Sequence, residues 1–260
     1  MSKNRLDQTL ALRGLSTTRS QAESLIRLGK VKVNGRAITK PGFFVGQNDD
    51  IELQAEERYV SRAGLKLASV SEMLSLDFND KTVLDVGSST GGFTDYALRH
   101  GAKKVVAVDV GTDQLHPSLR DDPKIELHEQ TDIRRVTSPD VLASVITVDS
   151  AKNSVKLGEI PDMVLIDVSF ISLREVLPHI ATLVSDKSQI VAMLKPQFEA
   201  GSGSKHKGVI KNDSMRRYIL KEFELWAKQY FVIQAKADSE VSGARGNQER
   251  FYLLRKFKTS

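Results

Sequence analysis

Two charged side chains directly follow apolar runs. A charge at such a position is poorly explained as an ordinary surface residue. Residues 164–166 read Val-Leu-Ile and end in Asp167, and residues 191–194 read Val-Ala-Met-Leu and end in Lys195. Because Pro196 restricts the residue before it to an extended conformation, the strand should end there and Lys195 should point into the cleft at the strand ends. A lysine and an aspartate that meet in such a cleft could assist a proton transfer or orient a hydroxyl group.

A glycine loop follows another apolar run. Residues 82–87 read Thr-Val-Leu-Asp-Val-Gly, and the loop continues as Ser-Ser-Thr-Gly-Gly-Phe. The spacing lacks both the dinucleotide fingerprint and the Lys-Ser/Thr of a phosphate-binding loop, which disfavours a nucleoside triphosphate. Asp85 could accept a ligand ammonium, and Asp109, at the end of the next apolar run, could accept both ribose hydroxyls. These demands match S-adenosylmethionine, although a plain structural turn remains the alternative for the loop alone.

Hydrophobic periodicity places these residues on strands that alternate with helices. The expected strands are 82–87, 105–108, 163–167, 190–194, 231–235 and 251–254, and the expected helices include one ending near 99 and those at 173–183 and 215–228. Such alternation indicates a parallel sheet covered on both faces, with ligands at the carboxyl ends of its strands. The expected fold class is therefore α/β, a Rossmann-like sheet with a small N-terminal α+β domain.

The first fifty residues predict that small domain. Residues 18–21 fit a capping box for a helix at 19–28, and a shorter helix is expected at 6–12. Asn34-Gly35, between short alternating runs, is a strong hairpin signal because both turn positions need positive φ. Ile51 and Leu53 supply a closing strand.

The charge of the chain is concentrated in this domain. Residues 1–48 contain nine Lys and Arg against only Asp7 and Glu23, a local net charge of +7, whereas the whole chain carries +5. This asymmetry favours a polyanion-binding appendage, and a solvated basic face without a partner is the alternative.

The motifs of this domain resemble a known module. Arg5-Leu6-Asp7, Ser20-Gln21-Ala22 and the stretch from Gly29 to Gly35 resemble the small RNA-binding module of ribosomal protein uS4 and of many pseudouridine synthases. The resemblance implies that the helix and the hairpin present cations to an RNA backbone, contacts that give affinity without reading sequence. The positions available for this role are Arg5, Arg13, Arg19, Arg27, Lys30 and Lys32.

Two further charges complete a second resemblance. Lys66 stands near the start of a helix before the first strand of the body, and Glu249 opens the last strand. Lys66, Asp167, Lys195 and Glu249 resemble the Lys-Asp-Lys-Glu catalytic tetrad of FtsJ-like ribose 2′-O-methyltransferases. Asp-Val-Ser-Phe-Ile-Ser from residue 167 and Lys-Pro-Gln-Phe-Glu-Ala-Gly from residue 195 resemble the TlyA (hemolysin A) family, which joins the uS4-like module to that fold.

The resemblance spans nearly the whole chain and implies an enzyme, an S-adenosylmethionine-dependent methyltransferase acting on a cytidine ribose of ribosomal RNA. Its partners would be ribosomal RNA or ribosomal subunits. Family members usually carry Asn where this chain has Asp132, a site expected to meet the adenine edge, and residues 137–160 and 242–247 also depart from the pattern. The residues expected to bind the cofactor are Asp85, Gly87, Ser88, Ser89, Gly91, Gly92, Phe93, Asp109, Asp132 and Asp167.

Lys195 has two possible roles in such a reaction. As a general base it must lose its own proton, which Lys66 and partial burial would favour and which Asp167 and Glu249 would oppose. As a positioning group it would orient the hydroxyl oxygen toward the methyl donor, with proximity supplying the acceleration. The residues alone leave both roles open.

Composition bounds the remaining possibilities. The chain has 260 residues and no cysteine, which excludes disulfides, iron–sulfur clusters and thiolate chemistry, and its five histidines lack metal-ligand spacing, so no metal is expected. The polar start and the absence of a long apolar run predict a cytoplasmic protein without a membrane partner. The expected domains are 1–54 for RNA binding, a linker at 55–61 and a methyltransferase domain at 62–260, and the oligomeric state stays open.

Two other functions remain as alternatives. One is an RNA-binding ribosome assembly factor whose methyl-donor site is vestigial. The other is a membrane-active hemolysin, which the family's historical name suggests but which no amphipathic or spanning segment supports.

Overall fold

The computed structural model describes residues 4–16, 18–27, 29–53, 59–140, 154–200, 209–210, 212–243 and 246–258. The chain divides into two compact units, Met1–Arg58 and Tyr59–Ser260. Tyr59 packs into the core of the second unit, and the backbone N–H of Val60 donates to Asp95 at 2.8 Å. Residues 59–61 of the expected linker thus belong to the body of the second unit, and residues 55–58 lie outside the described residues.

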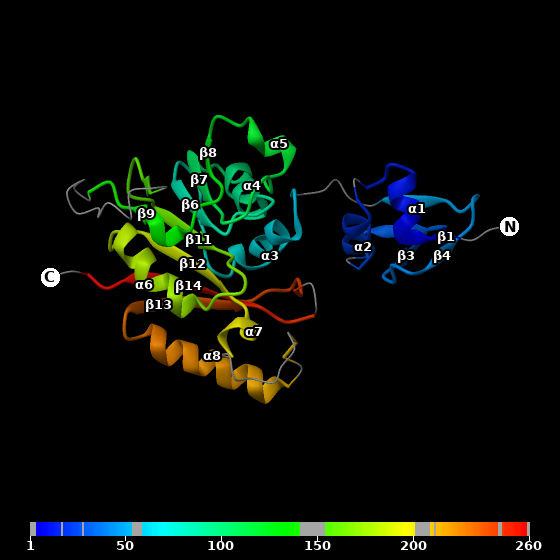
Figure 1. Ribbon diagram of the computed structural model, residues 1–260. Coiled ribbons are helices and arrows are strands. Elements are labelled where there is room, and N and C mark those ends of the chain that lie inside the picture. The colour runs from blue at the N-terminus through cyan, green and yellow to red at the C-terminus, as the bar shows by residue number, and fades with distance from the viewer. Residues whose placement is uncertain are drawn as a thin grey trace. The chain divides into compact units, whose positions relative to one another are not determined.

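The second unit is built on a seven-stranded sheet in the order β13-β14-β12-β11-β6-β7-β8 (Figure 1). Five strands are parallel, namely β6 (Thr82–Val86), β7 (Lys104–Val108), β8 (Ile125–His128), β11 (Met163–Ile166) and β12 (Gln189–Leu194). At one edge β14 (Arg250–Lys256) is antiparallel to both β12 and β13 (Phe231–Asp238). The strand order reverses between β6 and β11, the place where open α/β sheets bind ligands.

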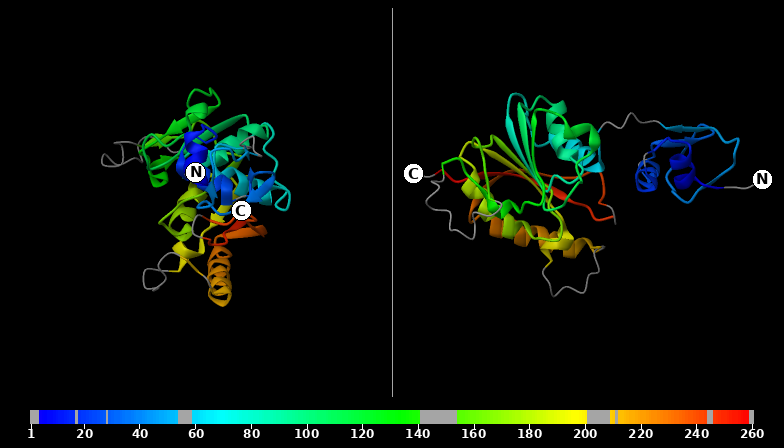
Figure 2. Two further views of the ribbon diagram at one scale, coloured as in Figure 1. Left: turned by 90° about the vertical axis from the view of Figure 1, so that its right-hand side faces the viewer. Right: turned by 45° about the horizontal axis from the view of Figure 1, so that its top comes forward.

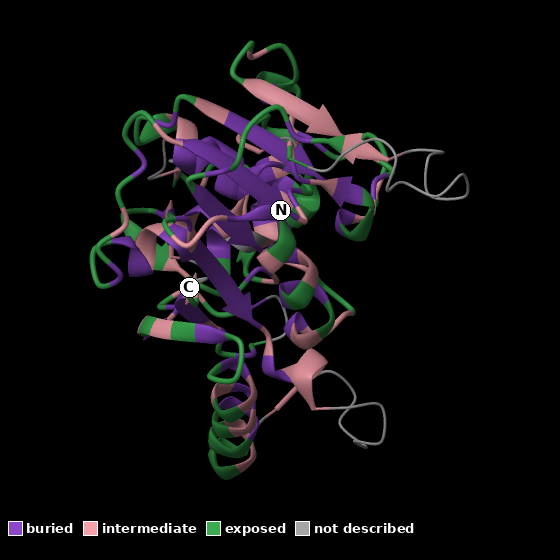
Figure 3. Ribbon diagram, turned by 90° about the vertical axis from the view of Figure 1, so that its left-hand side faces the viewer, coloured by how far each residue is buried: buried purple, intermediate pink, exposed green. Residues whose placement is uncertain are grey.

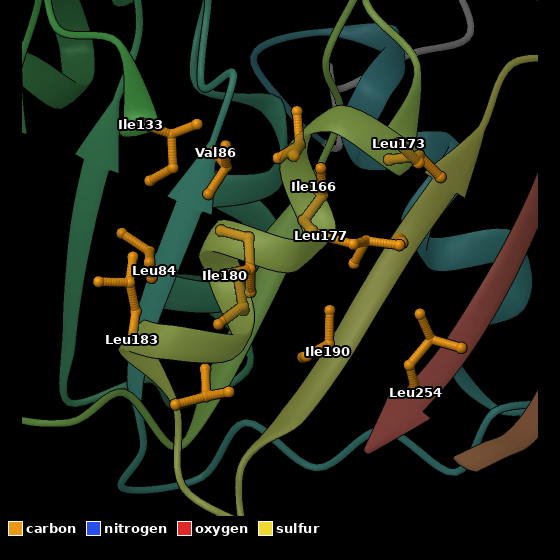
Figure 4. Close-up of a cluster of buried hydrophobic side chains, with 14 of the residues drawn as sticks. Leu84, Val86, Ile133, Ile166, Leu173, Leu177, Ile180, Leu183, Ile190 and Leu254 are labelled. Atoms are coloured by element: carbon orange, nitrogen blue, oxygen red, sulfur yellow. The ribbon is translucent and has the colours of Figure 1, made fainter. Parts of the chain in front are cut away.

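Helices cover both faces of this sheet (Figures 1 and 2). Helices α3 (Arg62–Ser71) and α4 (Gly92–Arg99) pack on one face, and α6 (Leu173–Leu183) and α8 (Asp213–Ala227) pack on the other. Successive residues of a strand point to opposite faces. Val83 therefore packs in the core beneath α3 and α4, and Leu84 packs in the core beneath α6 and α8. Figure 4 shows Leu84 beside the α6 side chains Ile180 and Leu183. The central strands are buried along their whole length, as Figure 3 shows, which is why they read as continuous apolar runs.

Short elements lie around the strand ends of the second unit. Those that follow the parallel strands are α5 (Pro117–Arg120), the 3-10 helix η1 (Ile133–Arg135) and α7 (Pro196–Glu199). β9 (Val136–Thr137) and β10 (Val155–Lys156) form a separate parallel pair, and β10 lies inside the stretch 137–160 that departs from the family pattern. Residues 141–153 of that stretch lie outside the described residues.

The first unit has a small core of its own beneath helices α1 (Leu6–Leu12) and α2 (Arg19–Arg27). The strands β2 (Val31–Val33), β3 (Arg36–Ile38) and β5 (Ile51–Leu53) form an antiparallel sheet, and β1 (Asn4–Arg5) pairs with β4 (Phe44–Val45). Asn34 and Gly35 turn between β2 and β3 with φ of 50° and 77°, as the hairpin signal predicts. The expected fold class, a Rossmann-like sheet with a small α+β domain, is therefore confirmed.

Candidate functional site

A cavity of about 380 Å³ opens at the carboxyl ends of β6, β7 and β11. Its size suits a small-molecule ligand, and its place at the reversal of strand order suits a nucleotide-type one. Five of the residues expected to bind a cofactor line it, namely Gly87, Ser89, Asp109, Asp132 and Asp167. The wall is completed by apolar side chains such as Val86, Val108 and Ile171.

The glycine loop after β6 has a backbone that only small residues tolerate. Gly87 has φ of 80°, and a Cβ built on it would lie 2.8 Å from the backbone oxygen of Asp167. Gly87 therefore lets the ends of β6 and β11 approach each other directly beside the cavity. Ser89 follows in the left-handed region with φ of 46°, and its backbone N–H donates to Asp109 at 2.8 Å.

Asp109 is a preorganised acceptor on the cavity wall. One carboxylate oxygen accepts from the backbone N–H of Ser89, and the other accepts from that of Gly111 at 2.6 Å. Each oxygen keeps a second lone pair, so the carboxylate can also accept from a pair of ligand hydroxyls. The residue is 9% exposed, as expected for a side chain that meets a bound molecule inside a cavity.

Asp132 lies on the same wall but has a partner within the chain. Its carboxylate accepts from the guanidinium and the backbone N–H of Arg134, and this bonding holds the pKa of Asp132 below its usual range. An ionised carboxylate can accept an amino hydrogen, so Asp132 remains able to meet an adenine edge.

Asp85 does not line the cavity and points to the face of the sheet that carries α4. It is fully buried, one oxygen accepts from the Thr94 hydroxyl at 2.6 Å, and the other oxygen, Oδ1, has no hydrogen-bond partner. Burial raises the pKa of Asp85 to about 7, the Thr94 hydroxyl opposes that rise, and the charges of Asp167 and Asp109 add to it. On the wall itself the carboxylates of Asp109 and Asp132 supply negative charge, which fits a ligand that carries an ammonium and a sulfonium.

The other residues expected to bind the cofactor do not line the cavity. The Ser88 hydroxyl is buried without a hydrogen-bond partner. Gly91 has φ of 88°, and a Cβ there would come within 2.7 Å of both Leu115 and Leu119. Gly92 faces α3, where a Cβ would collide with Ser61 and Ala63, and Phe93 packs in the hydrophobic core. These residues set the conformation of the loop and pack helix α4, which begins at Gly92, against its neighbours.

Lys195 and Asp167 meet at the edge of the cavity. Nζ of Lys195 lies 2.6 Å from Oδ1 of Asp167 and donates to the Ser169 hydroxyl at 2.7 Å. The backbone of Lys195 is extended, with φ of −105° and ψ of 104°, and Pro196 begins α7, as expected from the Lys-Pro pair. Both side chains are largely buried, with 10% and 16% of their surfaces exposed.

Lys66 and Glu249 form a second ion pair. Nζ of Lys66 lies 2.5 Å from Oε2 of Glu249, and the side chains are only 11% and 4% exposed. Because Leu194 of β12 is in register with Arg250 of β14, Glu249 lies at the same end of the sheet as Lys195. The four charged residues expected to act together thus form two ion pairs, and both pairs lie at the end of the sheet where β12 ends and β14 begins.

The six cations of the first unit fall into three groups. Arg5 and Arg19 both donate to the buried carboxylate of Asp7, and these bonds, with that from Arg5 the largest, lower its pKa to about 2. Arg13 donates to backbone oxygens at residues 47 and 49. Of the remaining three, Arg27 at the end of α2 and Lys30 just before β2 are exposed, and Lys32 in β2 is half-buried.

Sequence reasoning missed several residues at the cavity, and two of them follow the Asp167 strand end. Ser169 lies against the Lys195 ammonium, and Phe170 lines the cavity with φ of 66° and 91% of its surface exposed. Both stand directly after the Asp167 strand end, which was the available signal. Ser169 and Phe170 were noted only as part of the family motif. Nothing in the sequence pattern predicts the left-handed backbone at Phe170 that leaves its ring exposed.

Two kinds of site are absent from the described part of the chain. It holds no group of three or more His, Asp or Glu side chains arranged for a metal ion. Among the same residues, every helix is too short or too polar to cross a membrane.

Two family models match the chain, an FtsJ-like methyltransferase over residues 59–257 and an S4 domain over residues 4–51. The "16S/23S rRNA (cytidine-2'-O)-methyltransferase TlyA" of Mycobacterium tuberculosis (strain ATCC 25618 / H37Rv) is 35% identical over 256 residues, 96% of this chain and 89% of the relative. The "23S rRNA (cytidine-2'-O)-methyltransferase TlyA" of Campylobacter jejuni subsp. jejuni serotype O:23/36 (strain 81-176) is 34% identical and covers 92% of this chain and 94% of its own. A solved structure titled "Putative hemolysin from Streptococcus thermophilus" is similar with a TM-score of 0.70 at 36% identity, covering 100% of this chain and 90% of that one.

Proposed function

The chain belongs to the FtsJ-like methyltransferase family, and on that premise we propose that it transfers the methyl group of S-adenosylmethionine to the 2′-oxygen of a ribose in ribosomal RNA. The relatives named for cytidine-2′-O methylation make a cytidine the proposed target. The S4 domain would hold the RNA through its cations. Since ribosomal RNA is a cytoplasmic substrate, the proposed location is the cytoplasm.

The single observation that carries this proposal is the Lys195–Asp167 pair at the edge of the cavity. When bound, the cofactor supplies an electrophilic methyl group on a sulfonium. Asp109 would accept from the ribose hydroxyls of the cofactor, and Asp132 would accept from its adenine amino group. Asp85 is fully buried outside the cavity lining, so it could act on a bound cofactor only through its charge. The residues present therefore fit this cofactor.

The contacts of Lys195 favour a positioning role. Its ammonium lies within ion-pair distance of the Asp167 carboxylate and donates to the Ser169 hydroxyl, and these contacts hold it in place. The ammonium carries three hydrogens, so it can still donate to the target ribose oxygen and orient that oxygen toward the methyl group. In the transfer the oxygen–carbon bond forms, the sulfur–carbon bond breaks, and the hydroxyl proton leaves to solvent or a neighbouring base. Lys66 and Glu249 would support the pair from the neighbouring strand and helix.

The test is methyl transfer to purified 16S and 23S ribosomal RNA from labelled S-adenosylmethionine. Wild-type protein should label a ribose, and Lys195→Ala should reduce the rate at least 100-fold while it still binds the cofactor. An assembly factor would bind RNA without labelling it and would show no heat of cofactor binding in calorimetry. A hemolysin would release dye from liposomes, which we expect this protein not to do.

A further inference from the structure

The carboxylate of Glu199 joins two segments that each carry part of the candidate site. Glu199 is the last residue of α7, which follows Lys195 directly, and its side chain is only 2% exposed. One oxygen accepts from the Ser172 hydroxyl and the other from the backbone N–H of Leu173, both at 2.6 Å. Ser172 and Leu173 begin helix α6, so a carboxylate from the segment after β12 caps the helix that follows β11.

This contact is the last in an ordered series between the two segments. Lys195 contacts Asp167 and Ser169, and the Phe198 ring then lies 5.2 Å from the Phe170 ring. The Glu199 contacts follow at residues 172 and 173. Because the contacts follow the same order along both segments, the two lie side by side. Loss of the Glu199 contacts would free the end of the series farthest from the strands.

The segment after β11 needs such an anchor because its backbone is strained. Phe170 has φ of 66°, a conformation that costs a non-glycine residue free energy and that persists only where the surroundings impose it. At the strand side, the backbone N–H of Asp167 donates to Val86 at 3.0 Å. At the helix side, Glu199 holds Ser172 and Leu173. The strained turn therefore lies between two fixed points.

We propose that Glu199 is a positioning residue for methyl transfer, which holds the segment carrying Asp167 and Ser169 against the segment carrying Lys195. It acts through these residues and does not touch the substrate. The inference rests on the proposed function. Its consequence is that loss of the Glu199 carboxylate lets the Lys195 ammonium leave its position, and a displacement of about 1 Å is enough to slow a positioned reaction 100-fold.

A merely structural role gives a different expectation. Loss of a helix cap lowers stability, but molecules that remain folded would react at the normal rate. Most of the cavity wall, including Gly87, Ser89, Asp109 and Asp132, lies on other strand ends. The held segment itself contributes Ser169, Phe170 and Ile171 to the wall, so cofactor affinity should change less than kcat when this segment is released, which separates kcat from binding.

The experiment compares Glu199→Ala and Glu199→Gln with Ser188→Ala in the full-length protein. Ser188 is a matched control because its buried hydroxyl donates to the Pro161 backbone oxygen at 2.7 Å, just before β12 begins, at the end of the sheet opposite Lys195. Three readouts are needed below the melting temperature: kcat for methyl transfer, the Kd for S-adenosylmethionine, and amide hydrogen exchange at residues 169–173.

Glu199→Ala should lower kcat 10- to 100-fold, change the cofactor Kd less than threefold and speed exchange at residues 169–173. Glu199→Gln, which keeps one acceptor oxygen, should have a smaller effect, and Ser188→Ala should lose stability only. The inference is overturned if Glu199→Ala keeps the kcat of the control, or if cofactor affinity falls by the same factor as kcat. If wild-type protein transfers no methyl group, the proposed function fails and this inference with it, while the exchange data still report whether Glu199 joins the segments.

Discussion

Lys66 and Glu249 form a nearly buried ion pair of 2.5 Å between helix α3 and the start of β14. α3 packs against α4, whose N-terminus begins at the glycine loop, and β14 pairs with β12, which ends at Lys195. The pair thus connects the helix layer beside the cofactor cavity to the strand that carries Lys195.

Removing one member of this pair should destabilise the second unit. A buried charge that has lost its partner costs about 3–5 kcal/mol, whereas loss of both charges costs much less. We therefore expect Lys66→Met and Glu249→Gln each to lower the free energy of unfolding, and the double variant to lower it by less than the sum of the two. Urea denaturation measures all three variants. Additive losses would mean that the pair is not coupled.

Asp109 should contribute more to cofactor binding than Asp132. The Asp109 carboxylate is fixed by two backbone N–H groups and faces the cavity, whereas Asp132 is already paired with Arg134. Asp109→Asn should raise the Kd for S-adenosylmethionine at least 10-fold, because one charge-assisted hydrogen bond is worth about 1.5–3 kcal/mol. Asp132→Asn should change this Kd less than about threefold. Calorimetry checks both, and equal losses would contradict the assignment of Asp109 to the ribose hydroxyls.

Asp85 should make stability depend on pH in the acid range. Its pKa is about 7 in the folded protein and 3.8 for the ordinary carboxyl, so the folded state binds an extra proton between these values. The free energy of unfolding should therefore fall as the pH rises from about 4 to about 7. Asp85→Asn removes this contribution. The free energy of unfolding of the variant minus that of wild type should therefore be more positive at pH 8 than at pH 5. A pH-independent difference in melting temperature would contradict the raised pKa.

The cations of the first unit should separate into binding and structural classes. Lys30 is exposed, so Lys30→Gln should weaken RNA binding and reduce the slope of log affinity against log salt by about 1 without changing stability. Arg5 also pairs with buried Asp7, so Arg5→Gln should both weaken binding and destabilise the unit. Filter binding at several salt concentrations and thermal unfolding distinguish the two. Loss of stability in Lys30→Gln would place that residue in the wrong class.

The sequence predicted the elements whose signals are local. The α6 bounds at 173–183, the Asn34-Gly35 turn and the strand end at Lys195-Pro196 follow from periodicity, turn chemistry and proline restriction. β8 and the β9–β10 pair were not expected, because their short, half-polar sequences resemble loops.

The site residues also divide into those with a local sequence signal and those without one. Asp109, Asp167 and Lys195 are marked in the sequence itself, because each is a charge at the end of an apolar run. The sequence could not separate Gly87 on the cavity wall from Gly91 and Gly92, which are required by packing, because both uses select glycine. Nor could it show that Arg5 and Arg19 share Asp7, since that contact depends on how α1 and α2 pack.

In the proposed mechanism, Lys195 is held by Asp167 and Ser169 and orients a ribose oxygen for methyl transfer. The most direct measurement maps ribose methylation on ribosomal RNA incubated with cofactor and either wild-type protein or Lys195→Ala, after calorimetry has shown that both bind the cofactor. We expect a 2′-O-methylated nucleotide with wild-type protein and its loss with the variant. Equal methylation by both proteins, or a methyl group on a base instead of a ribose, would contradict it.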